Sequence, residues 1–231
     1  MIKAIFIDID NTLLDFDAYV REAMTEGFKA FGLPPYEEWM LGVFLRINGE
    51  FWRGIEDGTL TRAQLRENRW NAIFAALGID FDGPTFETYF RARLRDSAIP
   101  VEGAAEMLDY LQGRYVLCAA SNGPWEQQTN RLKTAGMAGY FRHVFVSERL
   151  GAEKPAAAFF DRCMAELNAG RAEPILPGEV LMLGDSLSSD MAGSIAFGMQ
   201  SCLFDRSGAV TDCGLPVDHI ICRLTDVRDF L

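Results

Sequence analysis

The sequence contains few of the residue types that build several common catalytic and structural sites. It has only two histidines, and neither His143 nor His219 lies near the acidic motifs described below, so a Ser-His-Asp arrangement has little support. Its five cysteines are odd in number, scattered and without a CxxC pair, which argues against a disulfide framework or a zinc site. We therefore expect reduced, mostly buried thiols. These cysteines are Cys118, Cys163, Cys202, Cys213 and Cys222.

Long apolar stretches and an excess of positive charge are also absent. No run reaches the roughly 18 apolar residues that a membrane span needs, and the apolar N-terminal segment meets Asp8 too early for a signal peptide. The formal net charge is −11, with 33 acidic residues against 22 Lys and Arg, so the surface repels nucleic-acid backbones and anionic membranes. We expect a cytoplasmic protein that binds neither nucleic acid nor membrane and exists as a monomer or a homodimer.

What the sequence does contain is an alternation of strand and helix patterns. The chain has 231 residues, of which 49% are apolar, which suits one compact domain or a domain with an insert. Residues 2–9 form a β-branched and aromatic run that ends in acids, which is typical of a buried strand. After Pro100, strands alternate with helices, which predicts an α/β fold with a Rossmann-like parallel sheet covered on both faces. The later strands are expected at 114–120, 143–147, 179–184, 201–204 and 218–222, and the helices at 101–112, 124–135, 155–168, 188–197 and the C-terminus.

The segment 16–98 has a different pattern. Apolar and aromatic residues recur in it at helical spacing, breaks divide it into about four helices, and no strand pattern is convincing. Most of its aromatic residues should pack in its own core. We therefore expect residues 1–15 and 99–231 to form the α/β core and residues 16–98 to form an inserted, all-helical domain.

Four polar segments follow the expected strands or open the expected helices. They are Asp8–Leu14, Ser121–Pro124, Lys154–Pro155 and Gly184–Asp190. Taken singly, each has an ordinary explanation as a turn, a helix cap or a solvated lysine. Because loops at the carboxyl ends of parallel strands meet at one edge of a sheet, we expect the four segments to converge there.

In this order the four segments resemble the motifs of haloacid dehalogenase-type phosphatases, which are DxDxT, a Ser or Thr before a helix, Lys-Pro, and GDxxxxD. The resemblance extends from Asp8 to Asp190. It implies that Asp8 attacks the phosphorus of a phosphate ester and becomes an aspartyl-phosphate. It also implies that Asp10 protonates the leaving oxygen and then acts as the base for the hydrolytic water.

The same resemblance implies a set of groups that bind the substrate. They are Thr12, Ser121, Asn122, Gly123 and Lys154. Ser121, with the amides of Asn122 and Gly123, would hold phosphate oxygens at a helix N-terminus. Lys154 would bridge the phosphate and the carboxylates as a mobile point charge.

The charges of the motifs indicate a bound cation. Four acidic side chains lie in the motifs, and within them only Lys154 opposes their charge. A dianionic phosphate would not enter such a pocket unaided, whereas a hard cation with oxygen ligands relieves the repulsion, and we expect Mg²⁺. The expected ligands are the Asp8 carboxylate, the Asp10 carbonyl and the Asp185 carboxylate, with Asp190 in a supporting position.

Within the family, the sequence resembles the pyrimidine 5′-nucleotidase branch. The matching stretches are DxDNTLLDFD at Asp8–Asp17, SNG at Ser121–Gly123 and SE..G..KP at Ser147–Pro155. The helical insert resembles the caps that close over the site in many members and govern specificity. The resemblance implies a nucleoside 5′-monophosphate as substrate, with aromatic side chains to stack its base. The candidate contact residues are Phe16, Tyr19 and Trp125.

Other functions remain open on the same residues. Another small phosphomonoester, such as a sugar phosphate or phosphoglycolate, would use identical core residues. A haloacid dehalogenase fits less well, because halide displacement has no need of an acid/base group at Asp10. Nothing in the insert identifies a phosphoglucomutase-type transferase. A non-catalytic phosphate-binding module is opposed by the intact set of Asp8, Asp10, Lys154 and Asp185.

Overall fold

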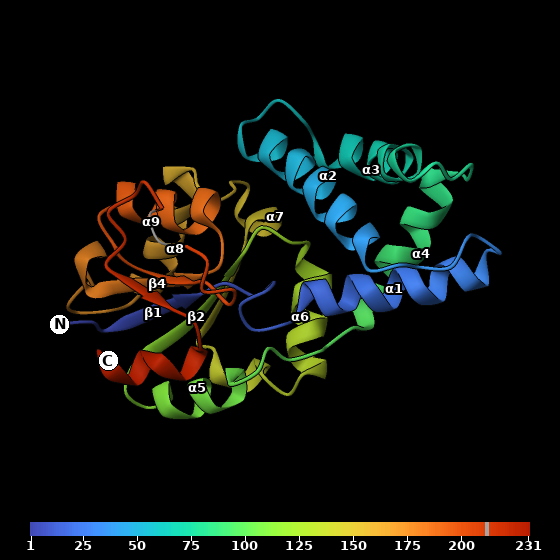
Figure 1. Ribbon diagram of the computed structural model, residues 1–231. Coiled ribbons are helices and arrows are strands. Elements are labelled where there is room, and N and C mark those ends of the chain that lie inside the picture. Colours follow the sequence, from blue (N-terminus) through green and yellow to red (C-terminus); the bar gives the residue numbers. More distant parts are fainter. Residues whose placement is uncertain (211–212) are drawn as a thin grey trace. The chain divides into compact units, whose positions relative to one another are not determined.

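The structure is a computed structural model that describes residues 1–210 and 213–231, and the chain divides into two compact units. Residues 1–15 and 98–231 form the first, here called the sheet unit, and residues 16–97 form the second, the helical unit. Figure 1 shows a twisted sheet with covering helices in the sheet unit, and a bundle of helices in the helical unit.

Six parallel strands form the sheet, in the order β3-β2-β1-β4-β5-β6. The strands are β1 (Ala4–Ile7), β2 (Val116–Ser121), β3 (His143–Val146), β4 (Val180–Gly184), β5 (Gln200–Phe204) and β6 (His219–Ile221). The prediction of a parallel α/β sheet is confirmed, and all six expected strands are present. The first strand is shorter than the run 2–9, because the chain turns away after the Asp8 amide has donated to the Leu183 carbonyl.

Two apolar layers enclose the sheet, which is why its strands are almost continuously hydrophobic. In β1, Ile5 and Ile7 face one buried cluster, whereas Ala4 and Phe6 face the other, as the two-residue period of a strand requires. The first cluster includes side chains of α5 (Ala104–Leu111), and the second includes side chains of α8 (Ala157–Asn168). Figure 1 shows α5 on one side of the sheet and α8 on the other.

The remaining helical segments of the sheet unit are short. They are α6 (Trp125–Thr134), α7 (Ser147–Leu150), α9 (Ala192–Ala196), the 3-10 helices η1 (Ala138–Tyr140), η2 (Pro177–Glu179) and η4 (Leu224–Asp229), and the π-helical turn η3 (Leu187–Met191). The sequence did not predict α7, η1 or η2, and the expected terminal helix is the 3-10 helix η4. The helix expected at 188–197 begins as η3, because the Ser186 carbonyl accepts both the Asp190 amide and, one residue further on, the Met191 amide.

The helical unit consists of the four helices that the sequence predicts. They are α1 (Phe16–Ala30), α2 (Trp39–Glu56), α3 (Arg62–Leu77) and α4 (Gly83–Asp96). Aromatic side chains fill the core of this unit, with Trp70 packed against Phe86 at a centroid distance of 4.3 Å. A buried ion pair joins Arg69 to Glu87 at 2.8 Å. The aromatic residues of this segment therefore serve mainly as its core, as their helical spacing indicates.

The strand order places a natural site at the carboxyl end of β1. From β1 the chain goes on to β2 on one side, while β4 pairs with β1 on the other, so the connections diverge at this point. Open parallel sheets bind their ligands at the crevice that such a reversal leaves. None of the helices in the described residues combines the length and apolar character needed to cross a membrane.

Candidate active site

The segment after β1 folds into a tight turn that carries two acidic side chains. The amides of Leu13 and Leu14 both donate to the Ile9 carbonyl, and Asn11 adopts a left-handed conformation with φ of 58°. Asparagine tolerates this region better than most residues because its short polar side chain can bond locally. The turn leaves Asp8 buried at 7% exposure, with the Asp10 side chain about a third exposed.

The Lys154 side chain joins the segments that contain Asp8 and Asp190 to the end of β2. Its Nζ donates to Asp8 Oδ1 at 2.6 Å, to Asp190 Oδ1 at 2.6 Å and to the Ala120 carbonyl at 2.8 Å. These bonds engage all three ammonium hydrogens of a side chain that is 1% exposed. Burial alone would lower the pKa of Lys154, but the negative charges of Asp190 and Asp8 together outweigh it and raise the pKa. Lys154 is therefore a fixed cation.

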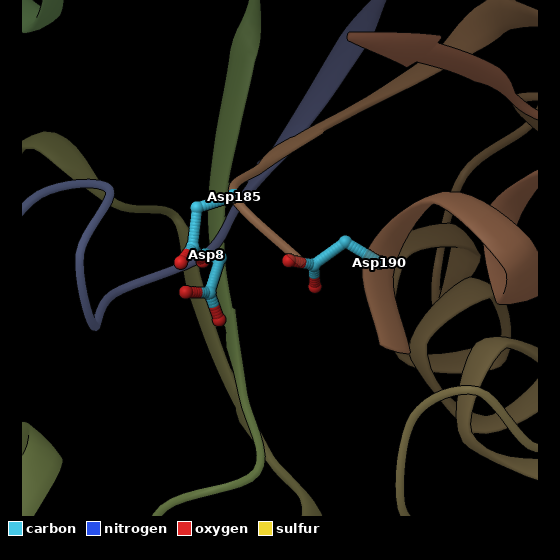
Figure 2. A group of neighbouring side chains, drawn as sticks. All are labelled: Asp8, Asp185 and Asp190. Atoms are coloured by element: carbon cyan, nitrogen blue, oxygen red, sulfur yellow. The ribbon is translucent and has the colours of Figure 1, made fainter. Parts of the chain in front are cut away.

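Asp185 completes an acidic group with Asp8 and Asp190. One carboxylate oxygen of each lies within 4.8 Å of the other two. Figure 2 shows the Asp8 and Asp185 side chains next to each other, with the Asp190 carboxylate turned toward them. Asp185 is the most exposed of the three.

Asp190 has a different environment from the other two acids. It is fully buried, and its Oδ1 accepts from Lys154 while its Oδ2 accepts from the Ser186 amide at 3.1 Å. Gly184 makes room for it, because a Cβ at this position would lie 2.2 Å from Asp190 Oδ2. Both oxygens are thus engaged with the protein, which fits a residue that holds Lys154 in place.

Asp8 and Asp185 both resist ionisation. Burial raises the pKa of Asp8 to about 7, and the charges of Asp190 and Asp10 add to the increase, while Lys154 opposes it. Desolvation by the surrounding protein also raises the pKa of Asp185 well above its ordinary value, with repulsion from Asp8 and Asp190. Carboxylate oxygens that repel one another at this spacing are the donors that a hard divalent cation prefers. The residues therefore fit the cation expected from the sequence.

Side chains of the segment after β2 form hydrogen bonds with backbone groups of the protein. Asn122 is paired with the Lys154 backbone in both directions, since its Nδ2 donates to the carbonyl and its Oδ1 accepts from the amide, both at 2.9 Å. The Gly123 amide donates to Ser121 Oγ at 3.0 Å. Of the expected phosphate-binding groups in this loop, the Asn122 side chain and the Gly123 amide therefore have partners within the protein.

Two residues of α6 belong to the site and were not identified from the sequence. Gln128 Nε2 donates to Asp10 Oδ2 at 2.7 Å and to Ser121 Oγ at 2.8 Å, and Arg131 Nη1 donates to Asp10 Oδ1. Arg131 is thus a second buried cation beside the acids. The segment WEQQTNRLKT has little apolar surface for a helix that covers a sheet, so its buried face had to include polar side chains.

Four other expected contact residues have clear positions. Thr12 is fully buried and its Oγ1 has no hydrogen-bond partner among the described residues. Tyr19 is 2% exposed inside the helical unit, where its hydroxyl donates to the Phe90 carbonyl, so it is part of that core. Phe16 contacts the Tyr19 and Phe90 rings. Trp125 lies beneath the Arg149 guanidinium, 4.6 Å from its ring centroid.

Residues 2–198 match the sequence model of the haloacid dehalogenase-like hydrolases. This span covers most of the chain and contains every residue of the site described above. The chain therefore belongs to the haloacid dehalogenase-like hydrolase family, and the resemblance noted in its motifs is confirmed.

The chain is similar to a curated nucleotidase and to several solved structures. Pyrimidine 5′-nucleotidase PynA of Streptococcus pneumoniae is 32% identical over 192 residues, which cover 83% of this chain and 78% of that protein. A solved structure of the HAD-hydrolase YfnB of Bacillus subtilis, bound to magnesium, is 26% identical with a TM-score of 0.87, and the match covers 100% of this chain and 98% of that one. L-2-haloacid dehalogenase of Xanthobacter autotrophicus has a TM-score of 0.76 with full coverage of both chains, but at 19% identity this likeness shows the fold alone.

Proposed function

We propose that the protein is a Mg²⁺-dependent phosphomonoester hydrolase that forms an aspartyl-phosphate on Asp8. The observation that carries this proposal is the arrangement around Asp8. Lys154 donates to it at 2.6 Å, Asp185 lies beside it, and Asp10 follows two residues later with Gln128 linking it to Ser121. A nucleophile, an acid/base group, a fixed cation and a hydroxyl donor are what phosphoryl transfer to a carboxylate requires.

In the first step the Asp8 carboxylate forms a bond to phosphorus, and the bond from phosphorus to the leaving oxygen breaks. Asp10 gives its proton to that oxygen, so the product leaves as a neutral alcohol. The positive charge of the Lys154 ammonium and a hydrogen bond from the Ser121 hydroxyl stabilise the negative oxygens of the transferring group. In the second step Asp10 takes a proton from water, which attacks phosphorus, and inorganic phosphate and the Asp8 carboxylate are released.

The residues that would hold the cation are the carboxylates of Asp8 and Asp185 and the carbonyl of Asp10. Support comes from the crowding of the acids and from the raised pKa values of Asp8 and Asp185, which a positive charge would relieve. When bound, Mg²⁺ neutralises negative charge on the phosphate and orients it for attack. Asp190 supports Lys154 instead of binding the cation, because both of its oxygens are engaged.

We further propose that the substrate is a nucleoside 5′-monophosphate, with pyrimidine nucleotides preferred. The support is the similarity to PynA and the nucleotidase-like sequence pattern of the Asp8, Ser121 and Lys154 segments. The helical unit would select the leaving group, as caps do in proteins that resemble this one. Sugar phosphates and phosphoglycolate are the alternative substrates, since the same core residues would act on them.

Dehalogenation is less well supported. The dehalogenase structure resembles this chain in fold only. Displacement of halide from carbon releases a weakly basic anion that needs no proton, whereas Asp10 is positioned by two donors next to Ser121. An alcohol leaving group does need a proton donor, and this difference favours a phosphate ester over a haloacid.

The proposal is tested by phosphate release from pyrimidine and purine 5′-monophosphates, sugar phosphates, phosphoglycolate and 4-nitrophenyl phosphate. Each ester is assayed with Mg²⁺, with EDTA, and with the Asp8→Asn variant, and chloride release from 2-chloropropionate is followed in parallel. We expect turnover that EDTA abolishes and that Asp8→Asn lowers on the order of 10⁴-fold or more. Acid-quenched wild-type protein should carry phosphate on Asp8. Chloride release without phosphate release would overturn the proposal.

A further inference from the structure

We propose that Gln128 and Arg131 are positioning residues of this reaction, which fix the directions in which Ser121 and Asp10 face the substrate. The inference rests on the proposed function, because that function assigns Ser121 to the phosphoryl group and Asp10 to proton transfer. Neither residue of α6 needs to touch the substrate in this role. Both side chains are buried, with exposures of 0% for Gln128 and 1% for Arg131.

The partners of the Gln128 amide determine which way it points. Its Nε2 donates to Asp10 Oδ2 and Ser121 Oγ, and its Oε1 accepts from Arg131 Nη1 at 2.9 Å. In the flipped orientation the amide oxygen would face a carboxylate, and the amide N–H groups would face a guanidinium. Only one orientation is therefore compatible with its neighbours, and it commits one N–H to each of two motif loops.

This arrangement decides what the Ser121 hydroxyl can do. Its Oγ accepts from Gln128 Nε2 and from the Gly123 amide, and a hydroxyl oxygen has two lone pairs. Its acceptor capacity is thus filled, and its own hydrogen is left to donate elsewhere. Ser121 presents a hydrogen-bond donor, which is the partner that an anionic phosphoryl oxygen requires.

Asp10 is fixed by the same helix. Arg131 donates to one of its oxygens and Gln128 to the other, so the plane of the carboxylate is set by two donors. The Asp10 side chain is 34% exposed and lies in a tight turn, whereas the Arg131 side chain is 1% exposed and lies on a helix. Proton transfer depends steeply on geometry, and a displacement of about 1 Å can lower a rate on the order of 100-fold. The two residues supply this constraint from a rigid element.

Gly123 indicates that the loop after β2 is built around Gln128. A Cβ at position 123 would lie 2.6 Å from Gln128 Cδ and 2.7 Å from its Cγ and Nε2. Gly123 is not among the glycines with a positive φ angle, so its need for glycine is one of space. The absence of a side chain here lets the Gln128 amide reach both Ser121 and Asp10.

The test compares Gln128→Leu with Gln127→Leu, which is the same change at the adjacent, half-buried position of α6. Arg131→Met and Arg131→Lys form the second pair, in which lysine restores a cation. For each variant kcat/KM is measured on a nucleoside monophosphate and on 4-nitrophenyl phosphate, whose leaving group departs without a proton. Inhibition by inorganic phosphate reports on the Ser121 donor separately.

We expect Gln128→Leu and Arg131→Met to lower kcat/KM for the nucleotide by roughly 10- to 100-fold. Arg131→Met should change the aryl ester far less, and Gln128→Leu should lower it by a smaller factor than the nucleotide, because Ser121 binds the phosphoryl group of both esters. Gln128→Leu should also weaken inhibition by phosphate, while Gln127→Leu stays within about twofold of wild type in every measurement. Arg131→Lys should recover part of the nucleotide activity that Arg131→Met loses. If Gln128→Leu does not fold, Gln128→Glu keeps the shape, places an acid against Asp10 and should show the same ester dependence.

Equal losses on both esters, or equal effects of Gln127→Leu and Gln128→Leu, would overturn the inference. Failure of the proposed function has a different signature. In that case the wild-type protein releases no phosphate from any ester, or Asp8→Asn leaves its turnover unchanged. An active wild type that depends on Asp8 but ignores Gln128 refutes the positioning role alone.

Discussion

Lys154 carries its charge where water does not reach it. Its ammonium group contacts Asp8, Asp190 and the Ala120 carbonyl, and the side chain is 1% exposed. A surface ion pair contributes little to stability, whereas loss of one partner from a buried pair leaves an uncompensated charge inside the protein. The residue that holds the proposed nucleophile therefore also stabilises the fold.

Replacement of Lys154 by Met should lower the free energy of unfolding by about 3–5 kcal/mol and abolish phosphate release. The double variant Lys154→Met with Asp190→Asn should regain part of that stability, because one of the stranded charges is gone, but it should regain no turnover. Urea unfolding and phosphate release measure the two quantities separately. Equal stability of the single and double variants would show that the buried Asp190 charge is not what destabilises the first.

At the level of elements, α9 approaches the Lys154 loop very closely. A Cβ on Gly193 would lie 2.8 Å from Pro155 Cα and 2.9 Å from the Pro155 carbonyl oxygen. Alanine is favoured over glycine in a helix by about 1 kcal/mol, but these neighbours are backbone atoms that cannot rotate away. Overpacking of this kind costs typically 1–3 kcal/mol, so the clash should outweigh the helix propensity.

Gly193→Ala is therefore expected to destabilise the protein by about 1–2 kcal/mol and to lower turnover, because it displaces the segment that carries Lys154. Gly139→Ala is the matched control, since a Cβ there meets nothing within 4 Å. Thermal unfolding and phosphate release are measured for both variants. If Gly193→Ala is as stable and active as Gly139→Ala, the contact between α9 and the loop does not constrain the site.

The elements also show what the sequence can and cannot predict. The six strands and the four helices of the helical unit follow from local periodicity. Asp8 and Asp185 follow from their places after strands, and Lys154 from its place before a helix. The π-helical turn η3 does not, because it depends on how the Asp190 side chain bonds back to Ser186. Gln128 and Arg131 were missed for a similar reason. Their roles come from partners in distant loops, and such partners leave no local pattern.

At the scale of the whole molecule, folding brings several acidic side chains close together. Without a metal ion, burial of their charges opposes folding. The folded-state pKa of Asp8 is about 7, above its ordinary value of 3.8. A raised acid pKa means that the folded state binds the proton more tightly than the unfolded state. The corresponding contribution to stability is fully present below about pH 4 and is lost as the pH rises through 7.

Mg²⁺ binding requires the ionised carboxylate and should therefore depend on pH in the opposite sense. We expect Mg²⁺ to raise the melting temperature more at pH 8 than at pH 6, with an apparent affinity that weakens roughly tenfold per pH unit below 7. Differential scanning fluorimetry with and without Mg²⁺ measures this difference. Asp185→Asn is the control, and it should show little response to Mg²⁺ at either pH. The same rise at both pH values would contradict the prediction.

The strand order of the sheet has a consequence for the synthesis of this protein. The bond from Lys154 to Asp8 spans 146 residues, and Asp190 must also be in place before Lys154 has its full set of partners. Contacts of such long range form late in folding, after the intervening strands have paired. A ribosome-bound chain that ends before β4 can therefore hold Asp8 but no working site. Enzyme activity in this protein therefore reports that β1, β2 and β4 have paired, and it can serve as a folding assay for truncated or arrested chains.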